Sequence, residues 1–153
     1  MKVDLVVRVN APKDAVWRIV SDIENAEHIV SGIDRVEVLE KPASGLSGLK
    51  WRETRTLFGK TAVETMWITE AVEGSHYRTE ARNHGAVYRS RVYVEEYGES
   101  GTCLGMTFQA EAHTFAAKLA SLLLAPLMKG ATRKALLQDL EDIKAASESA
   151  GGD

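Results

Sequence analysis

Cysteine, charge of one sign and long apolar runs are all scarce in this 153-residue sequence. Its single cysteine, Cys103, excludes an internal disulfide and any metal site built from several cysteines. The net charge is only −3 at pH 7, and no basic stripe of the kind that binds a phosphate backbone is present, so we expect no nucleic-acid partner. The apolar stretch from Leu119 to Met128 is about half of the ~20 residues that a membrane span requires, which favours a buried helix and no transmembrane segment.

Several local signals are absent as well. No signal peptide opens the chain, and no linker, repeat or low-complexity segment interrupts it, so we expect one cytoplasmic domain over residues 1–146 and a flexible tail over 147–153. The motifs GxGxxG and GxSxG do not occur. Gly59-Lys60-Thr61 has the form of the end of a phosphate-binding loop, but Thr54 stands where that motif needs its earlier glycine. The four histidines lie on different predicted elements, and the sequence indicates neither a metal nor a cofactor.

The first third of the chain carries a strand signal followed by helical spacing. Apolar residues alternate with mostly polar ones at Val3, Leu5, Val7 and Val9, which is typical of a half-buried strand. Pro12 suits a first helical turn, and Ser21-Asp22-Ile23-Glu24 has the form of a capping box. These features predict two short helices, at 12–20 and 22–30.

The middle of the chain is rich in Val, Thr, Tyr and Trp, with glycines at regular intervals. This pattern predicts six strands joined by short turns, near 33–40, 49–58, 60–71, 75–83, 86–96 and 102–112. Short turns join antiparallel neighbours, so we expect a meander.

After His113 the apolar period returns to 3.6 and predicts a helix of more than thirty residues, with a kink near Pro126. Its apolar stripe consists of Leu119, Leu122, Leu123, Leu127, Gly130, Leu137 and Leu140. Gly130 on this stripe has two interpretations: close packing against a strand, or room for a ligand.

Cross-strand pairing suggests where polar groups lie. A turn at Gly59-Lys60 would place Arg55 opposite Glu64 and Trp51 opposite Ile68, and the charged pair is then either solvated or partly buried in an apolar wall.

A turn at His84-Gly85 would place Glu80 opposite Arg89 and Arg78 opposite Arg91, which assigns that arginine-rich face to the outside. The opposite, inward face mixes apolar residues with the hydroxyls of Thr79, Tyr88 and Ser90, a composition typical of small-molecule sites.

The order of strand, two short helices, six strands and a long helix resembles the START/SRPBCC helix-grip superfamily, and in particular its bacterial polyketide cyclase/dehydrase-like branch. The matching segments are Asn-Ala-Pro-x-x-x-Val-Trp at 10–17, Ser-Asp-Ile-Glu-Asn at 21–25, Gly-Leu-Lys-Trp-Arg-Glu-Thr-Arg at 48–55 through Phe58-Gly59, and Pro-Leu-Met at 126–128 with Leu-Glu-Asp-Ile-Lys at 140–144. The sequence departs from many relatives at Ala26-Glu27-His28, where they carry Trp or Pro.

The resemblance implies an α+β fold in which a seven-stranded curved antiparallel sheet wraps around the long C-terminal helix, in the order β-α-α-β6-α, with a hydrophobic cavity between them. Members of the superfamily bind lipids, polyketides, hormones or other apolar molecules, and a minority catalyse cyclisation or dehydration.

We therefore expect a monomer or homodimer that binds or transports a small hydrophobic ligand without catalysis, with Arg55 and Glu64 orienting a polar end of that ligand. The expected ligand-binding residues are Trp51, Arg55, Glu64, Met66, Thr79, Tyr88, Ser90, Met106, Phe108, Leu119, Leu123 and Leu127. A second hypothesis is a cyclase or dehydratase in which Glu64 or Tyr88 acts as general acid or base and Arg55 stabilises an enolate. A third is a partner-binding or stress-related module that uses the outer arginines Arg78, Arg82, Arg89 and Arg91.

Overall fold

A computed structural model describes the backbone of residues 1–57 and 59–151, with the side chains of those ranges except at 57, 121, 123–126 and 151. The elements follow the predicted order: β1 (Lys2–Val9), α1 (Lys13–Val20), the 3₁₀ helix η1 (Ile23–His28), β2 (Ile33–Glu40), β3 (Lys50–Leu57), β4 (Lys60–Val72), β5 (His76–Asn83), β6 (Ala86–Tyr97), β7 (Gly101–Ala112) and α2 (Phe115–Gly151).

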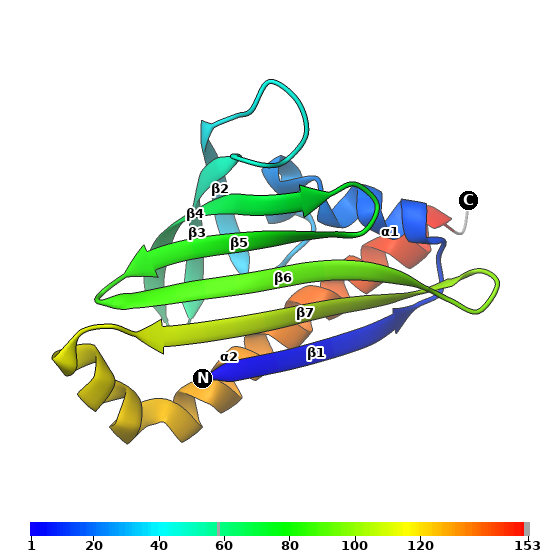
Figure 1. The fold of residues 1–153 in the computed structure, drawn as a ribbon. Coiled ribbons are helices and arrows are strands. Elements are labelled where there is room, and N and C mark those ends of the chain that lie inside the picture. Colours follow the sequence, from blue (N-terminus) through cyan, green and yellow to red (C-terminus); the bar gives the residue numbers. More distant parts are fainter. Residues whose placement is uncertain (58, 152–153) are drawn as a thin grey trace.

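The seven strands form one antiparallel sheet in the order β1-β7-β6-β5-β4-β3-β2. The sheet is curved, and α2 lies across its concave face, so the predicted α+β fold is confirmed (Figure 1). We call the concave side the inner face and the convex side the outer face. Because side chains alternate along a strand, every second residue of each strand lies on the inner face.

The start of the chain shows why these elements form. Burial in β1 alternates strictly, with Val3, Leu5, Val7 and Val9 on the inner face. The predicted capping box at Ser21 is wrong: the Ser21 hydroxyl donates to the carbonyl oxygen of Trp17 at 2.6 Å and closes α1, while η1 has no side-chain cap. The second predicted helix is therefore a short 3₁₀ segment, since the Ser21 hydroxyl is committed to the preceding turn.

Two hairpin turns set the strand registers. His84 and Gly85 both have positive φ (50° and 74°), as a two-residue hairpin turn that matches the strand twist requires. The predicted pairs of Glu80 with Arg89 and of Arg78 with Arg91 are confirmed.

The register between β3 and β4 differs from the prediction by two residues, because Leu57 pairs with Lys60. Arg55 consequently lies opposite Ala62, and Glu64 lies opposite Glu53. A shift of two preserves the alternation, so Arg55 and Glu64 keep the same face.

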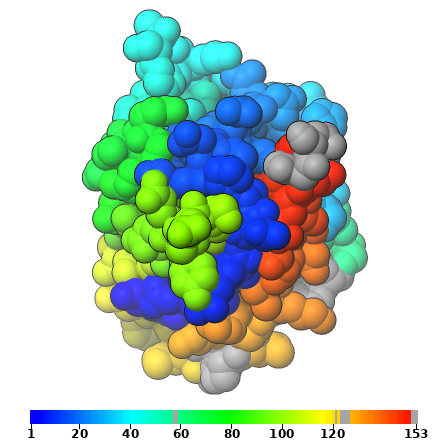
Figure 2. Space-filling model, turned by 90° about the vertical axis from the view of Figure 1, so that its right-hand side faces the viewer, coloured from blue at the N-terminus to red at the C-terminus, as the bar shows by residue number. Residues whose placement is uncertain are grey.

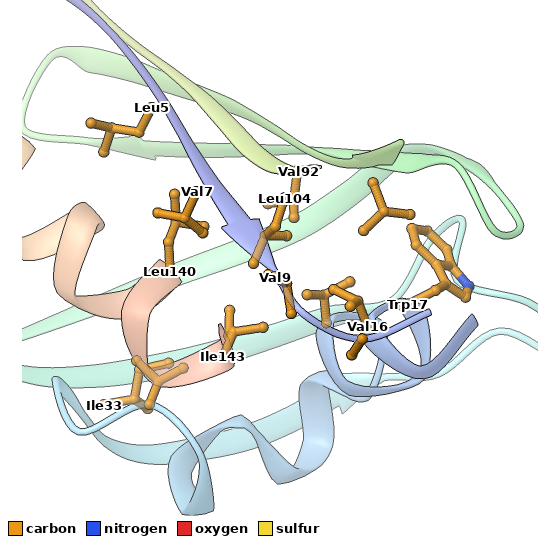
Figure 3. Close-up of a cluster of buried hydrophobic side chains, with 14 of the residues drawn as sticks. Leu5, Val7, Val9, Val16, Trp17, Ile33, Val92, Leu104, Leu140 and Ile143 are labelled. Atoms are coloured by element: carbon orange, nitrogen blue, oxygen red, sulfur yellow. The ribbon is translucent and has the colours of Figure 1, made fainter. Parts of the chain in front are cut away.

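The C-terminal half of α2 is packed tightly against the sheet and α1. Leu140 and Ile143 are 0% and 9% exposed and belong to one cluster with apolar residues of β1, α1, β6 and β7 (Figure 3). At this end of the molecule the red turns of α2 lie directly against the blue residues of β1 and α1 (Figure 2). Residues 147–151, expected as a flexible tail, continue the helix, and Ser147 is fully buried.

The N-terminal half of α2 behaves differently. The large apolar side chains that the structure describes in this half are exposed, among them Leu119 (50%), Leu122 (79%), Leu127 (73%) and Met128 (52%). The expectation of a buried helix over this stretch is therefore wrong, because these turns extend past the end of the sheet in a direction different from the rest of α2 (Figure 1). Figure 1 shows this change of direction within the N-terminal half of α2, the part of the helix in which the kink near Pro126 is predicted. No helix among the described residues is long and apolar enough to cross a membrane.

Candidate functional site

The burial of the side chains on the inner face differs between its two ends. Near α1 its side chains are fully packed, and Val92, Val94 and Leu104 are at most 3% exposed. Toward the N-terminal half of α2 several inward side chains are only half-buried, although they belong to the same face and their cross-strand neighbours Val3, Thr79 and Ala81 are at most 5% exposed. We call this region the accessible inner face; it consists of Glu64, Met66, Tyr88, Ser90, Met106 and Phe108.

Aromatic rings form much of this surface. The rings of Tyr88 and Phe108 are stacked, with centroids 6.1 Å apart. Gly130, on the stripe of α2, has no described atom of a neighbouring element within 4 Å of where a side chain would begin, so it makes no close-packing contact with a described strand. The accessible inner face therefore offers a half-buried aromatic and aliphatic wall, the usual lining of a site for a small apolar molecule.

Hydroxyls and one carboxylate interrupt this wall. Ser90 and the buried Thr79 are hydrogen-bonded to each other across β5 and β6. Burial and the charge of Glu64 raise the pKa of Tyr88, so its phenol stays protonated and can donate a hydrogen bond at neutral pH. Glu64 accepts a hydrogen bond from the side-chain amide of Asn83 through Oε1 at 3.0 Å, whereas Oε2 is buried and has no partner among the described residues.

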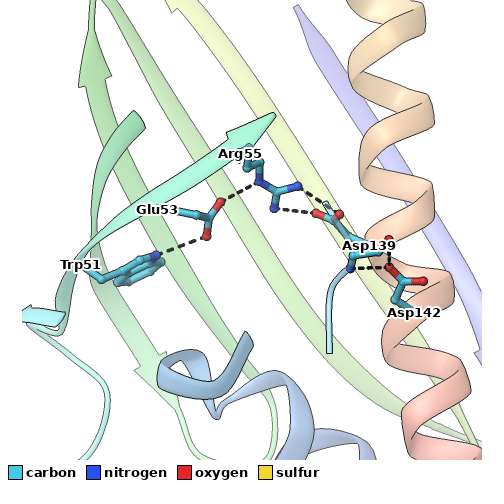
Figure 4. Close-up of polar contacts among 6 residues, drawn as sticks. Trp51, Glu53, Arg55, Asp139 and Asp142 are labelled. Carbon is cyan, nitrogen blue, oxygen red and sulfur yellow. Dashed lines mark hydrogen bonds and ion pairs between the residues drawn. The ribbon is translucent and has the colours of Figure 1, made fainter. Parts of the chain in front are cut away.

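Arg55 is held in a buried network rather than pointing a free guanidinium at a ligand (Figure 4). Its Nε donates to Glu53 at 2.8 Å, and its two terminal nitrogens donate to the two carboxylate oxygens of Asp139 at 3.1 and 2.8 Å. The Trp51 indole donates to the other oxygen of Glu53 at 3.3 Å. Burial alone would lower the pKa of Arg55, but the bonds to Asp139 and the charge of Glu53 raise it overall. The network ties β3 to α2 at the level of Asp139.

The outer arginines make ordinary surface contacts with acidic side chains or with an aromatic ring. Arg78 pairs with Glu70 at 3.7 Å, and Arg82 and Arg89 both pair with Glu80, at 3.3 and 3.6 Å. Arg91 lies over the Tyr93 ring, 4.7 Å from its centroid. Exposed pairs of this kind contribute about 0–1 kcal/mol each. Acids or an aromatic ring therefore contact each of these four side chains.

The structure divides the twelve predicted site residues into groups. Met66, Tyr88, Ser90, Met106 and Phe108 lie together on the accessible inner face, beside Glu64. Trp51 and Thr79 are on the same face but covered, at 3% and 5% exposure. Arg55 is committed to Glu53 and Asp139, Leu119 and Leu127 are exposed on α2, and the side chain of Leu123 lies outside the described residues.

Three polar residues of this region escaped the prediction of the site. Glu53 and Asn83 lie beside predicted residues on neighbouring strands, and strand alternation does assign both to the inner face, but neither was among the expected ligand-binding residues. Asp139 lies 84 residues from Arg55 in sequence, and no local pattern links the two.

Comparisons with known proteins agree with this architecture. Residues 1–148 match a family described as polyketide cyclase / dehydrase and lipid transport. No curated protein sequence matches the chain.

Solved structures match over almost the whole chain. A protein from Thermus thermophilus has a TM-score of 0.82 at 17% identity, with 98% of this chain and 99% of that chain covered. A START superfamily protein from Mycobacterium smegmatis has a TM-score of 0.80 at 17% identity, with 97% and 98% covered. The Zhui aromatase/cyclase from a Streptomyces species has a TM-score of 0.78 at 15% identity, with 97% and 93% covered. At these identities the likeness establishes the helix-grip fold.

Proposed function

Because the chain belongs to the polyketide cyclase/dehydrase and lipid transport family, we propose that it binds or transports a small hydrophobic molecule of lipid, polyketide or aromatic type. The ligand would lie on the accessible inner face, beneath the N-terminal half of α2. The observation that carries this proposal is the group of partly exposed, mainly apolar and aromatic side chains at one end of the inner face, whereas the inward side chains near α1 are fully packed.

Burial of apolar surface supplies the affinity in this proposal. Each Å² of apolar surface removed from water contributes roughly 25 cal/mol. Met66, Met106 and Phe108 give an adaptable wall, since thioethers and an aromatic ring accommodate irregular guests. The exposed Leu119 and Leu127 of α2 would gain burial from the same ligand.

Fluorescence of N-phenyl-1-naphthylamine, a neutral apolar probe, tests the proposal. We expect saturable uptake by the wild-type protein. Ala110→Phe should weaken uptake at least about tenfold, because Ala110 is a small inward residue opposite Tyr88 and a ring there fills the space of the ligand.

The matched control is Val63→Phe, since Val63 is exposed on the outer face of β4. Absence of saturable uptake, or equal uptake by both variants and the wild type, would contradict binding at the accessible inner face.

A cyclase or dehydratase at the same face is the second candidate, favoured by the protonated phenol of Tyr88 near the Glu64 carboxylate. These two groups could act as general acid and base. Arg55 does not suit the role of enolate stabiliser, because Glu53 and Asp139 already occupy its donors. A pH–rate profile on a poly-β-carbonyl substrate tests this candidate: a profile that is unchanged in Glu64→Gln and Tyr88→Phe would remove both residues from the reaction.

A further inference from the structure

The inner face carries unbalanced charge where β3 and β4 meet. Glu53 and Glu64 are direct cross-strand partners, and Asp139 approaches from α2. Arg55 is the counter-charge for Glu53 and Asp139. Within the described part of the chain Glu64 takes part in no ion pair, so this group of four side chains holds three carboxylates and one cation.

Among the described residues, one of the two carboxylate oxygens of Glu64 lacks a hydrogen-bond donor. Oε1 is satisfied by Asn83 at 3.0 Å, but Oε2 is buried with no donor within reach among the described residues. A buried carboxylate oxygen without a donor is costly, because it has lost water and gained nothing in exchange. Like charges directly opposite each other on two strands add to this cost. A hydrogen-bond donor that also carries positive charge would reduce both the cost of the unsatisfied oxygen and the repulsion between Glu53 and Glu64.

We propose that Glu64 binds the protonated amine of an amphiphilic ligand whose apolar body lies on the accessible inner face. The inference rests on the proposed function and adds the chemical class of the ligand's polar end. An ammonium group has three donors and one positive charge, so it can satisfy Oε2 and balance the excess carboxylate. A carboxylate or phosphate head group would instead meet Glu64 and Glu53 with like charge. Tyr88 and Phe108 provide the aromatic wall beside it.

Three ligands with one apolar chain and different head groups test the proposal: n-decylamine, n-decanol and n-decanoate. Each competes at pH 7 with N-phenyl-1-naphthylamine bound to the wild-type protein. We expect the amine to displace the probe at a concentration at least about tenfold lower than decanoate, the effect of one charge-assisted hydrogen bond. Glu64→Gln keeps the size of the side chain and its contact with Asn83, and it should abolish the preference for the amine.

The matched control is Glu70→Gln on the outer face of the same strand, where Glu70 pairs with Arg78. This variant should keep the preference for the amine. Equal displacement by the three ligands, tighter binding of decanoate, or a preference that survives Glu64→Gln overturns the inference while leaving the proposed function intact. If the probe itself does not bind, the proposed function fails and the inference fails with it.

Discussion

Replacing Arg55 by methionine should destabilise the fold far more than the loss of a surface charge. Arg55 pairs with Glu53 at 2.8 Å and binds Asp139 through two nitrogens, and the Glu53 and Asp139 side chains are only 13% and 6% exposed. Methionine fills much of the same volume but leaves two carboxylates without counter-charge. Removing one partner of a buried ion pair costs about 3–5 kcal/mol. Since Arg55 is itself 21% exposed, we expect a value near the lower end, about 3 kcal/mol.

Urea unfolding followed by tryptophan fluorescence measures this loss. The matched control is Arg52→Met, on the same strand but the outer face, where Arg52 pairs with Glu37 at 2.7 Å and the two side chains are 46% and 36% exposed. The control should lose about 0.2–1 kcal/mol. A loss for Arg55→Met no larger than that of the control would refute the role of Arg55 as a buried counter-charge.

The same variant has a pH signature. The pKa of Asp139 is raised overall, mainly by burial, and the hydrogen bonds and charge of Arg55 oppose only part of that rise. Without Arg55 that rise is unopposed, so the folded variant takes up a proton more readily than its unfolded chain. A group whose pKa is higher in the folded state gains stability as the pH falls. The difference between Arg55→Met and wild type should therefore shrink from pH 7 toward pH 4, and a difference that grows would contradict this assignment.

Three further substitutions have definite expectations. Burial alone would raise the pKa of Asp142, but hydrogen bonds from Ser31 lower it overall. Asp142→Asn should cost about 1 kcal/mol at pH 7, and urea unfolding should show this difference shrinking as the pH falls below about 4, whereas a constant difference to pH 3 would contradict it. Gly105→Ala places a Cβ closer to the end of the Tyr93 ring than two carbon atoms can approach. The half-buried ring must turn away from it, so thermal unfolding should show a loss of about 1 kcal/mol, and an unchanged Tm would contradict the contact. Leu127→Ser should change stability by less than about 0.5 kcal/mol, since Leu127 is 73% exposed, but should weaken uptake of N-phenyl-1-naphthylamine; unchanged uptake would remove Leu127 from the site.

Most of the sheet could be predicted from the sequence because alternation and turn residues are local signals. The inward apolar residues of β1, from Val3 to Val9, alternate as a half-buried strand must, and His84-Gly85 sets the β5–β6 register through two consecutive positive φ angles. The register at the β3–β4 turn was wrong by two residues, yet Arg55 and Glu64 stayed on the predicted face because two is the period of a strand.

The site was harder to predict because it depends on long-range placement. Helical spacing puts Leu122 and Leu140 on one stripe, but it does not say where the sheet ends, and so Leu140 is buried while Leu122 is 79% exposed. The spacing of apolar residues along α2 likewise does not show which turn of the helix packs against β3. The contact between Arg55 and Asp139 depends on that packing and on no local sequence pattern.

Methyl NMR of protein labelled at its four methionines gives the most decisive measurement, because Met66 and Met106 both lie on the accessible inner face. Met66→Leu and Met106→Leu assign the two signals. Titration with N-phenyl-1-naphthylamine should shift both signals in a saturable manner, with one shared dissociation constant. If both stay unshifted while the probe is bound, the ligand lies elsewhere and the accessible inner face is not the binding site.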